Sequence, residues 1–212
     1  MVKTSYLELL ESSFPGIKSN ILRCQALGFP WAASKLFLKE DKGETLSHAA
    51  FFECPILVEG QRYNMGALHA ICTKPSRQGQ GLATQLIQEA LFWAKERCDM
   101  TLLFTEIPSF YKRFSFQSVQ EHRFRLPCAH PKGTHALRPV VAPQDDDLFL
   151  RLFRNREQVS SRLWIKDSGA IASFNTLFAT YPTYWSLYYS SVIDGFISYF
   201  LEDKTLHLLD VL

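Results

Sequence analysis

The sequence predicts a mixed α/β fold, in which helices flank one mixed sheet and a smaller α+β unit follows it. Three observations support this prediction. Residues 31–73 form three strand-like segments joined by short turns, a pattern typical of an antiparallel meander. Residues 82–94 form an amphipathic helical pattern between two strand-like segments, which is typical of a parallel crossover. Beyond residue 143, helical and strand-like segments follow one another a second time.

The composition indicates an ordinary globular protein. Of the 212 residues, 47% are apolar and 21% are charged, and the net charge is +2 with no basic run, so nucleic acid is not expected as a partner. The five cysteines are scattered without a Cys-x-x-Cys pair, which argues against a disulfide framework or a metal site. There is no secretory signal pattern and no apolar stretch of membrane-spanning length, so we expect a cytoplasmic protein without a membrane partner.

The first elements are defined by periodicity and by turn residues. Residues 5–27 carry apolar side chains at helical spacing on both sides of a break at Pro15-Gly16. Strands are then predicted over Trp31–Lys39, Leu46–Val58 and Tyr63–Thr73, joined by turns at Asp41-Lys42-Gly43 and Glu59-Gly60-Gln61. Pro55 lies inside the second strand and predicts a bulge or an edge there, because proline has no N–H to donate.

The central stretch of the chain runs from Met65 to Ala94. An apolar strand is followed by the glycine pair Gln78-Gly79-Gln80-Gly81 and then by the clearest helix of the sequence. Glycines between a strand and a helix expose bare backbone N–H groups at the positive end of the helix dipole. The sequence therefore predicts a phosphate-binding turn that holds a phosphorylated cofactor.

The remaining elements complete one domain and begin another. The first domain is predicted over residues 1–127, a proline-rich linker over 128–143, and a partial domain of two helices and three strands over 144–212. The first domain ends with a strand at Met100–Thr105, a short helix from Pro108, and strands at Phe116–Val119 and Arg123–Leu126. The partial domain has helices around Leu148–Phe153 and Ala170–Ala179, strands at Tyr184–Ile193, Phe196–Leu201 and Leu206–Leu212, and turns at Asp194-Gly195 and Glu202-Asp203-Lys204.

Two familiar phosphate motifs do not fit the glycine pair. A dinucleotide-binding turn requires a third glycine where Thr84 stands, and an NTPase P-loop requires lysine where Leu82 follows Gly81. The segment Gln78-Gly79-Gln80-Gly81-Leu82-Ala83 instead resembles the coenzyme A loop Gln/Arg-x-x-Gly-x-Gly/Ala of the GNAT superfamily of N-acetyltransferases. Residues 110–116 resemble that family's Phe-Tyr-x-x-x-Gly-Phe segment, with Ser115 in place of the glycine.

The resemblance covers about residues 30–125 and implies a GNAT-type fold. More loosely, the two-part layout resembles acetyltransferases with a second GNAT-like domain, which is incomplete here. Acetyl-CoA is the implied co-substrate, with its pyrophosphate on the loop and its pantetheine arm beside a strand that splays from its neighbour. The expected cofactor-binding residues are Ile71, Cys72, Thr73, Gln78, Gly79, Gln80, Gly81, Leu82, Ala83 and Thr84.

The same resemblance implies that Tyr111 is the general acid, which protonates the departing thiolate. Many members of the family have a glutamate base near the position of Ala67, which has no group to serve. His69 shares the face of Ala67 by strand alternation and is one candidate base. Glu106 is the other candidate, and a water relay remains open.

The first functional hypothesis is acetyl transfer to a primary amine by direct attack in a ternary complex. The acceptor is a small molecule or a peptide amine. Cys72 lies on the cofactor strand, where its backbone is expected to contribute rather than its thiol. The alternative is a non-catalytic acyl-CoA-binding or interaction module. The apolar run Leu206–Leu212 is expected either to lie inside a sheet or to pair with another subunit, so a homodimer through the C-terminal half is possible.

Overall fold

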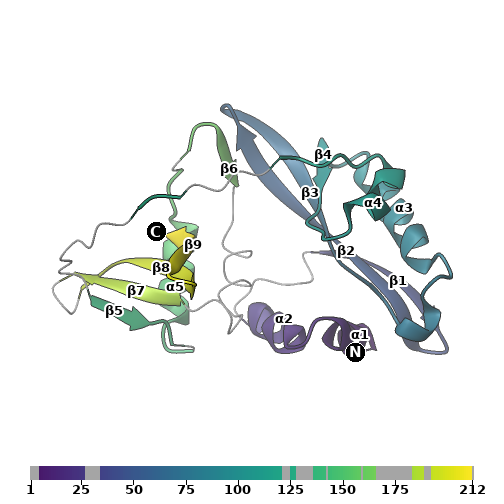
Figure 1. The fold of residues 1–212 in the computed structure, drawn as a ribbon, viewed down its shortest axis with the longest axis horizontal. Coiled ribbons are helices and arrows are strands. Elements are labelled where there is room, and N and C mark those ends of the chain that lie inside the picture. The colour runs from purple at the N-terminus through teal and green to yellow at the C-terminus, as the bar shows by residue number, and fades with distance from the viewer. Residues whose placement is uncertain are drawn as a thin grey trace. The chain divides into compact units, whose positions relative to one another are not determined.

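The computed structural model describes most of the chain as two compact units, Met1–Phe116 with Glu157–Phe174, and Gln117–Arg156 with Asn175–Leu212 (Figure 1). The residues that the structure describes are 5–26, 34–120, 125–127, 136–141, 143–158, 160–165, 183–188 and 192–211.

The first unit is built on an antiparallel meander of β1 (Lys35–Asp41), β2 (Glu44–Val58) and β3 (Gln61–Thr73). The two predicted turns are confirmed, and both have left-handed residues. Lys42 and Gly43 have φ values of 48° and 83°, and Glu59 and Gly60 have values of 50° and 78°. Two successive left-handed residues match the right-handed twist of the flanking strands, which explains the tight hairpins.

Two further strands extend this sheet. The short strand β4 (Met100–Leu102) pairs with β3 in the parallel direction, as the crossover pattern predicts, but it ends three residues before the predicted Thr105. The strand β6 (Leu163–Ile165) pairs with β2 from Ile56 to Val58. β1 and β6 pair with the same edge of β2, β1 as far as Phe51 and β6 from Ile56 onward. Pro55 lies in the short interval between these two pairings, among the residues that the structure describes. The missing N–H of a proline costs no ladder hydrogen bond in such an interval.

Helices cover both faces of this sheet (Figure 1). The helices α1 (Ser5–Ser13) and α2 (Ile17–Ala26) pack on one face, as the 5–27 pattern predicts, and α3 (Leu82–Ala94) packs on the other. Burial of apolar stripes against the sheet stabilises this arrangement. The core on the α3 face consists of Phe37, Ala49, Phe51, Leu68, Leu86, Ile87, Ala90, Ala94 and Tyr111, and the core on the α1 face consists of Tyr6, Leu7, Leu10, Ile17 and Ile21.

After β4, the chain forms the predicted short helix, α4 (Pro108–Tyr111), which continues as the 3₁₀ turn η3 (Lys112–Phe114). The predicted strand at 116–119 is wrong. Residues 116–120 have no regular secondary structure, because no described strand pairs with them, and the Val119 side chain is 86% exposed. The predicted strand at 123–126 lies partly outside the described residues, and residues 125 and 126 form no strand.

The second unit contains a four-stranded antiparallel sheet in the order β5-β7-β8-β9, and the helix α5 (Asp146–Arg154). Its strands are β5 (Ala136–Pro139), β7 (Thr183–Tyr188), β8 (Val192–Glu202) and β9 (Thr205–Val211). β5 lies within the stretch predicted as a linker. The side chains of Trp185 on β7 and Phe196 on β8 are fully buried in this unit.

The turn predicted at Asp194-Gly195 is wrong, because both residues lie inside β8. Gly195 pairs with Ser186 while Ile193 pairs with Leu187, so Asp194 is the extra residue of a β-bulge. A bulge and a hairpin turn favour the same residue types, which is why the two signals were confused. The predicted turn at 202–204 is confirmed, with Asp203 and Lys204 both left-handed.

The predicted helix at 170–179 lies outside the described residues. The outer strand β9 carries Leu206, Leu208, Leu209 and Val211 with about half of each side chain exposed, and a homodimer through this half of the chain stays a prediction. In the described part of the chain, no helix has the length and apolar character needed to span a membrane. The cytoplasmic location stays a prediction.

Candidate active site

The glycine pair forms the turn that the sequence predicts between β3 and α3. After the 3₁₀ turn η2 (Pro75–Arg77), Gly79 and Gly81 have φ values of 75° and 78°, and Gly81 is the N-cap of α3. A side chain added at either glycine would meet no atom within 4 Å. Glycine adopts this left-handed conformation without strain, and the open space lets a ligand approach the backbone closely.

The N-terminus of α3 has no side-chain cap, so the first N–H groups of the helix have no partner from the capping residue. The turn from Pro75 to Gly81 is exposed, and the expected cofactor residues Leu82, Ala83 and Thr84 form the half-buried first turn of α3. An exposed, uncapped helix N-terminus behind left-handed glycines is suited to bind an anionic group such as a pyrophosphate.

Backbone and side-chain hydrogen bonds hold this turn against the sheet. The Lys74 N–H donates to the Leu46 carbonyl at 2.9 Å, and the Arg77 N–H donates to the Lys74 carbonyl at 2.8 Å. The Gln78 side chain donates through Nε2 to the Thr73 carbonyl at 3.2 Å. Gln78 thus connects the turn to the end of β3.

The end of β3 is splayed in the way that the resemblance implies. β4 pairs with β3 only at Met65, Gly66 and Ala67. β2 pairs with β3 as far as Thr73, so the β4 side of residues 68–73 has no strand partner within the described chain. The expected cofactor residues Ile71, Cys72 and Thr73 lie in this segment. An extended ligand arm can add to such an edge as a further strand would.

A β-bulge lies in the same segment and was not predicted. His48 pairs with Cys72 and Ala50 pairs with His69, so one residue too many lies on β3 between these two pairs. Ala70 has a left-handed φ of 51°, which is uncommon for a residue with a side chain. Alanine has no preference for this conformation, so no local pattern of residues indicates the bulge.

Tyr111 ends α4 and is 8% exposed, in the same core as Leu68 of β3. Its ring packs edge-to-face on Phe110 at 5.0 Å and on Phe116 at 6.1 Å. Burial raises the pKa of Tyr111, and a hydrogen bond with the Thr105 side chain lowers it in part. The phenol therefore keeps its proton at neutral pH, as a general acid must before the reaction.

The motif position where glycine is usual holds Ser115 in this chain. Ser115 has a left-handed φ of 66° at the end of η3, and its N–H donates to the Lys112 carbonyl at 3.0 Å. The turn geometry that glycine favours is therefore present with serine.

The two candidate bases lie in different places. His69 alternates with the core residue Leu68, so it lies on the opposite face of β3 from the core that contains Tyr111. Its Nε2 lies 3.1 Å from the Ser34 hydroxyl. Burial, and secondarily the neighbouring His48, lower the pKa of His69 to about 4. Glu106 is exposed on the segment between β4 and α4. Both assignments stay predictions.

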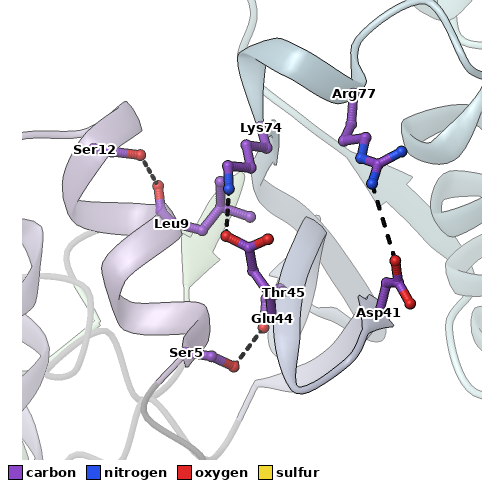
Figure 2. Close-up of polar contacts among 8 residues, drawn as sticks. All are labelled: Ser5, Leu9, Ser12, Asp41, Glu44, Thr45, Lys74 and Arg77. Carbon is purple, nitrogen blue, oxygen red and sulfur yellow. Dashed lines mark hydrogen bonds and ion pairs between the residues drawn. The ribbon is translucent and has the colours of Figure 1, made fainter.

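A pocket of about 370 Å³ lies between α1 and the β1–β2 hairpin, and Lys74 also lines it. Figure 2 shows Lys74 paired with Glu44, and Arg77 paired with Asp41 at 3.9 Å. The Ser5 and Thr45 hydroxyls share a hydrogen bond of 2.8 Å across the pocket. Sequence reasoning missed this pocket because its lining comes from three separate segments, Ser5–Ser12, Lys42–Thr45 and Lys74.

Comparison with known proteins identifies relatives of the first unit. A family model described as an acetyltransferase (GNAT) domain matches residues 4–119. The uncharacterized N-acetyltransferase YhbS of Escherichia coli (strain K12) is 29% identical over 113 residues, which is 53% of this chain and 65% of that protein. The chain therefore spans less than two thirds of this curated relative.

Two solved structures have a similar fold across both units. A conserved protein of unknown function from Enterococcus faecalis V583, titled a probable N-acyltransferase, is 11% identical with a TM-score of 0.60, covering 96% of this chain and 54% of that chain. A GCN5-related N-acetyltransferase from Kribbella flavida is 16% identical with a TM-score of 0.56, covering 100% of this chain and 55% of that chain. The chain spans about half the length of each, and the likeness establishes the mixed α/β fold.

Proposed function

This chain belongs to the GNAT acetyltransferase family, and on that premise we propose that it transfers an acetyl group from acetyl-CoA to a primary amine. One observation carries the proposal. The left-handed glycine turn leads into the N-terminus of α3 and follows a strand whose edge is left unpaired by β4. The turn provides donors for a pyrophosphate, and the strand edge provides a partner for an extended arm, so one continuous segment fits both parts of the cofactor.

In the proposed reaction, the neutral amine attacks the thioester carbonyl carbon and forms a tetrahedral intermediate. A backbone N–H on the unpaired edge of residues 71–73 is suited to stabilise its oxyanion. The intermediate collapses when the carbon–sulfur bond breaks and the thiolate takes the proton of the Tyr111 hydroxyl. The amine loses its extra proton to His69, to Glu106 or to water. The products are the N-acetylated amine and free coenzyme A.

The alternative is that the chain binds acyl-CoA without catalysis. It is favoured by Ala67 at the position where a glutamate is expected, and by the place of His69 across the strand from the Tyr111 core. The two functions differ in one observable, the release of free thiol. Saturable acetyl-CoA binding without thiol release over a panel of amines would favour the binding module.

The test of the proposal combines calorimetry with thiol release. We expect saturable binding of acetyl-CoA and amine-dependent release of coenzyme A from the wild-type chain. Tyr111→Phe is expected to bind acetyl-CoA normally but to lower kcat by about 100-fold or more, since it lacks the general acid. Absence of acetyl-CoA binding would overturn the proposed function. Full turnover in Tyr111→Phe would overturn only the role of Tyr111.

A further inference from the structure

The buried side chain of His48, on β2, contacts the bulge in β3. His48 is 0% exposed, and its ring stacks on Tyr6 of α1 with 5.8 Å between the ring centroids and 15° between the planes. Its Nδ1 lies 2.7 Å from the Ala70 carbonyl oxygen. A carbonyl can only accept, so Nδ1 carries the hydrogen and donates it.

This hydrogen bond meets a specific need of the bulge. The extra residue of a bulge is displaced from the regular ladder, so its peptide group needs a partner from elsewhere. Ala70 is also left-handed, a conformation that an alanine rarely keeps without outside support. The His48 side chain provides a short, buried hydrogen bond at this residue.

The neutral form of His48 fits this arrangement. With the hydrogen on Nδ1, Nε2 is a bare acceptor, and it is buried without a partner among the described residues. Burial lowers the pKa of His48, while the hydrogen bond to Ala70 opposes this shift in part. The ring therefore remains an uncharged donor at neutral pH.

The place of the bulge connects His48 to the candidate site. On the N-terminal side of the bulge, β3 pairs with β4 from Met65 to Ala67. On its C-terminal side, residues 71–73 form the unpaired edge proposed to bind the cofactor. Any relaxation of Ala70 to regular pairing would shift these residues by one position and turn their side chains to the other face.

We propose that His48 is a positioning residue, which fixes the β3 bulge through the Ala70 carbonyl and thereby holds residues 71–73 in the geometry that binds acetyl-CoA. The binding part of this inference rests on the proposed function. His48 lies on β2, which pairs with the edge of β3 opposite to β4.

Two substitutions of His48 by side chains that match each other in shape, asparagine and leucine, test the hydrogen-bond donor apart from the loss of the ring. Asparagine has an amide N–H at nearly the position of histidine Nδ1, whereas leucine has the same shape without a donor. Both lose the contact with Tyr6 to the same extent. His48→Leu is expected to weaken acetyl-CoA binding about tenfold, as for the loss of one buried hydrogen bond, and His48→Asn to stay within about threefold of wild type.

A second substitution tests the bulge itself. Ala70→Gly removes the steric cost of the left-handed conformation, so it is expected to restore part of the affinity in the His48→Leu background. Amide hydrogen exchange at residues 70–73 of the free protein gives a readout that does not need the cofactor. Exchange there is expected to be faster in His48→Leu than in His48→Asn.

The outcomes distinguish the two proposals. If the wild-type chain does not bind acetyl-CoA, the proposed function fails, and the exchange rates still decide whether His48 fixes the bulge. Equal exchange and equal affinity in the leucine and asparagine variants would overturn the role of the Nδ1 hydrogen bond. Faster exchange in His48→Leu with unchanged acetyl-CoA affinity would overturn the link from the bulge to binding.

Discussion

Acidification is expected to destabilise the first unit through His69. Burial lowers the pKa of His69 from 6.5 to about 4. Between these values the unfolded chain binds a proton at this side chain and the folded chain does not, so the free energy of unfolding falls as the pH falls through this window. The full loss is about 3 kcal/mol below pH 4, and about 2 kcal/mol of it is present at about pH 5.

The assay is urea unfolding of the wild type and of His69→Gln at about pH 7.5 and about pH 5. Glutamine does not titrate and keeps a polar nitrogen near the position of Nε2, where the Ser34 hydroxyl lies at 3.1 Å. We expect the wild type to lose about 2 kcal/mol more than the variant between the two pH values. His207→Gln, on β9 of the second unit, controls for removal of a histidine elsewhere.

Titrating groups that do not interact with His69 cancel in this comparison. Asp145 has a lowered pKa, chiefly because of its hydrogen bonds with Arg138, and both the wild type and the variant contain this pair. An NMR titration of the His69 ring measures the pKa directly. Equal losses of stability in wild type and His69→Gln, together with a measured pKa near 6.5, would refute the argument from burial.

Two further predictions concern glycines of the first unit. Gly66→Ala is expected to destabilise the protein by about 2–3 kcal/mol in urea unfolding, because a methyl group there would overlap the buried Phe51 ring and lie 3.1 Å from Cys98 Sγ. Adding Phe51→Leu should recover part of this loss. Gly81→Ala and Gly60→Ala both place alanine at a φ of 78° in open space, so both should lose about 1 kcal/mol of stability. Only Gly81→Ala should weaken acetyl-CoA binding in calorimetry, and equal binding by the two variants would count against the glycine turn as the cofactor site.

The sequence predicted the elements whose signals are local. The turn at Asp41-Lys42-Gly43 was predicted because its residue types adopt left-handed backbone easily, and the structure has them in that conformation. The break at Pro15-Gly16 was predicted from its turn-forming residues, and the helix after Gly81 was predicted from its apolar stripe. The same kind of signal misled at Asp194-Gly195, since the chain there continues as a strand through a bulge.

The features that escaped prediction depend on contacts between distant segments. Ala70 is left-handed although alanine does not favour that conformation, and its carbonyl is bonded by His48 of the neighbouring strand. The pocket between α1 and the β1–β2 hairpin likewise combines residues more than 30 positions apart. A single sequence does not show such pairs, because neither partner has an unusual local pattern.

The bulge also changes how the cofactor strand is interpreted. Strict alternation from His69 would place residue 71 on the α1 face and residue 72 on the α3 face. In the structure, Ile71 packs against the core on the α3 face, whereas Cys72 packs against the core on the α1 face. One extra residue has therefore exchanged the faces of the residues that follow it.

This exchange bears on the mechanism. The Cys72 thiol lies among the residues of α1, where burial raises its pKa and a hydrogen bond with the Ser13 side chain opposes that shift in part. A thiol with a raised pKa remains protonated at neutral pH and is a poor nucleophile. Formation of an acetyl–cysteine intermediate at Cys72 would require the thiolate. The place of this side chain therefore supports the proposed direct attack of the amine on the thioester, in which β3 contributes its backbone rather than its sulfur.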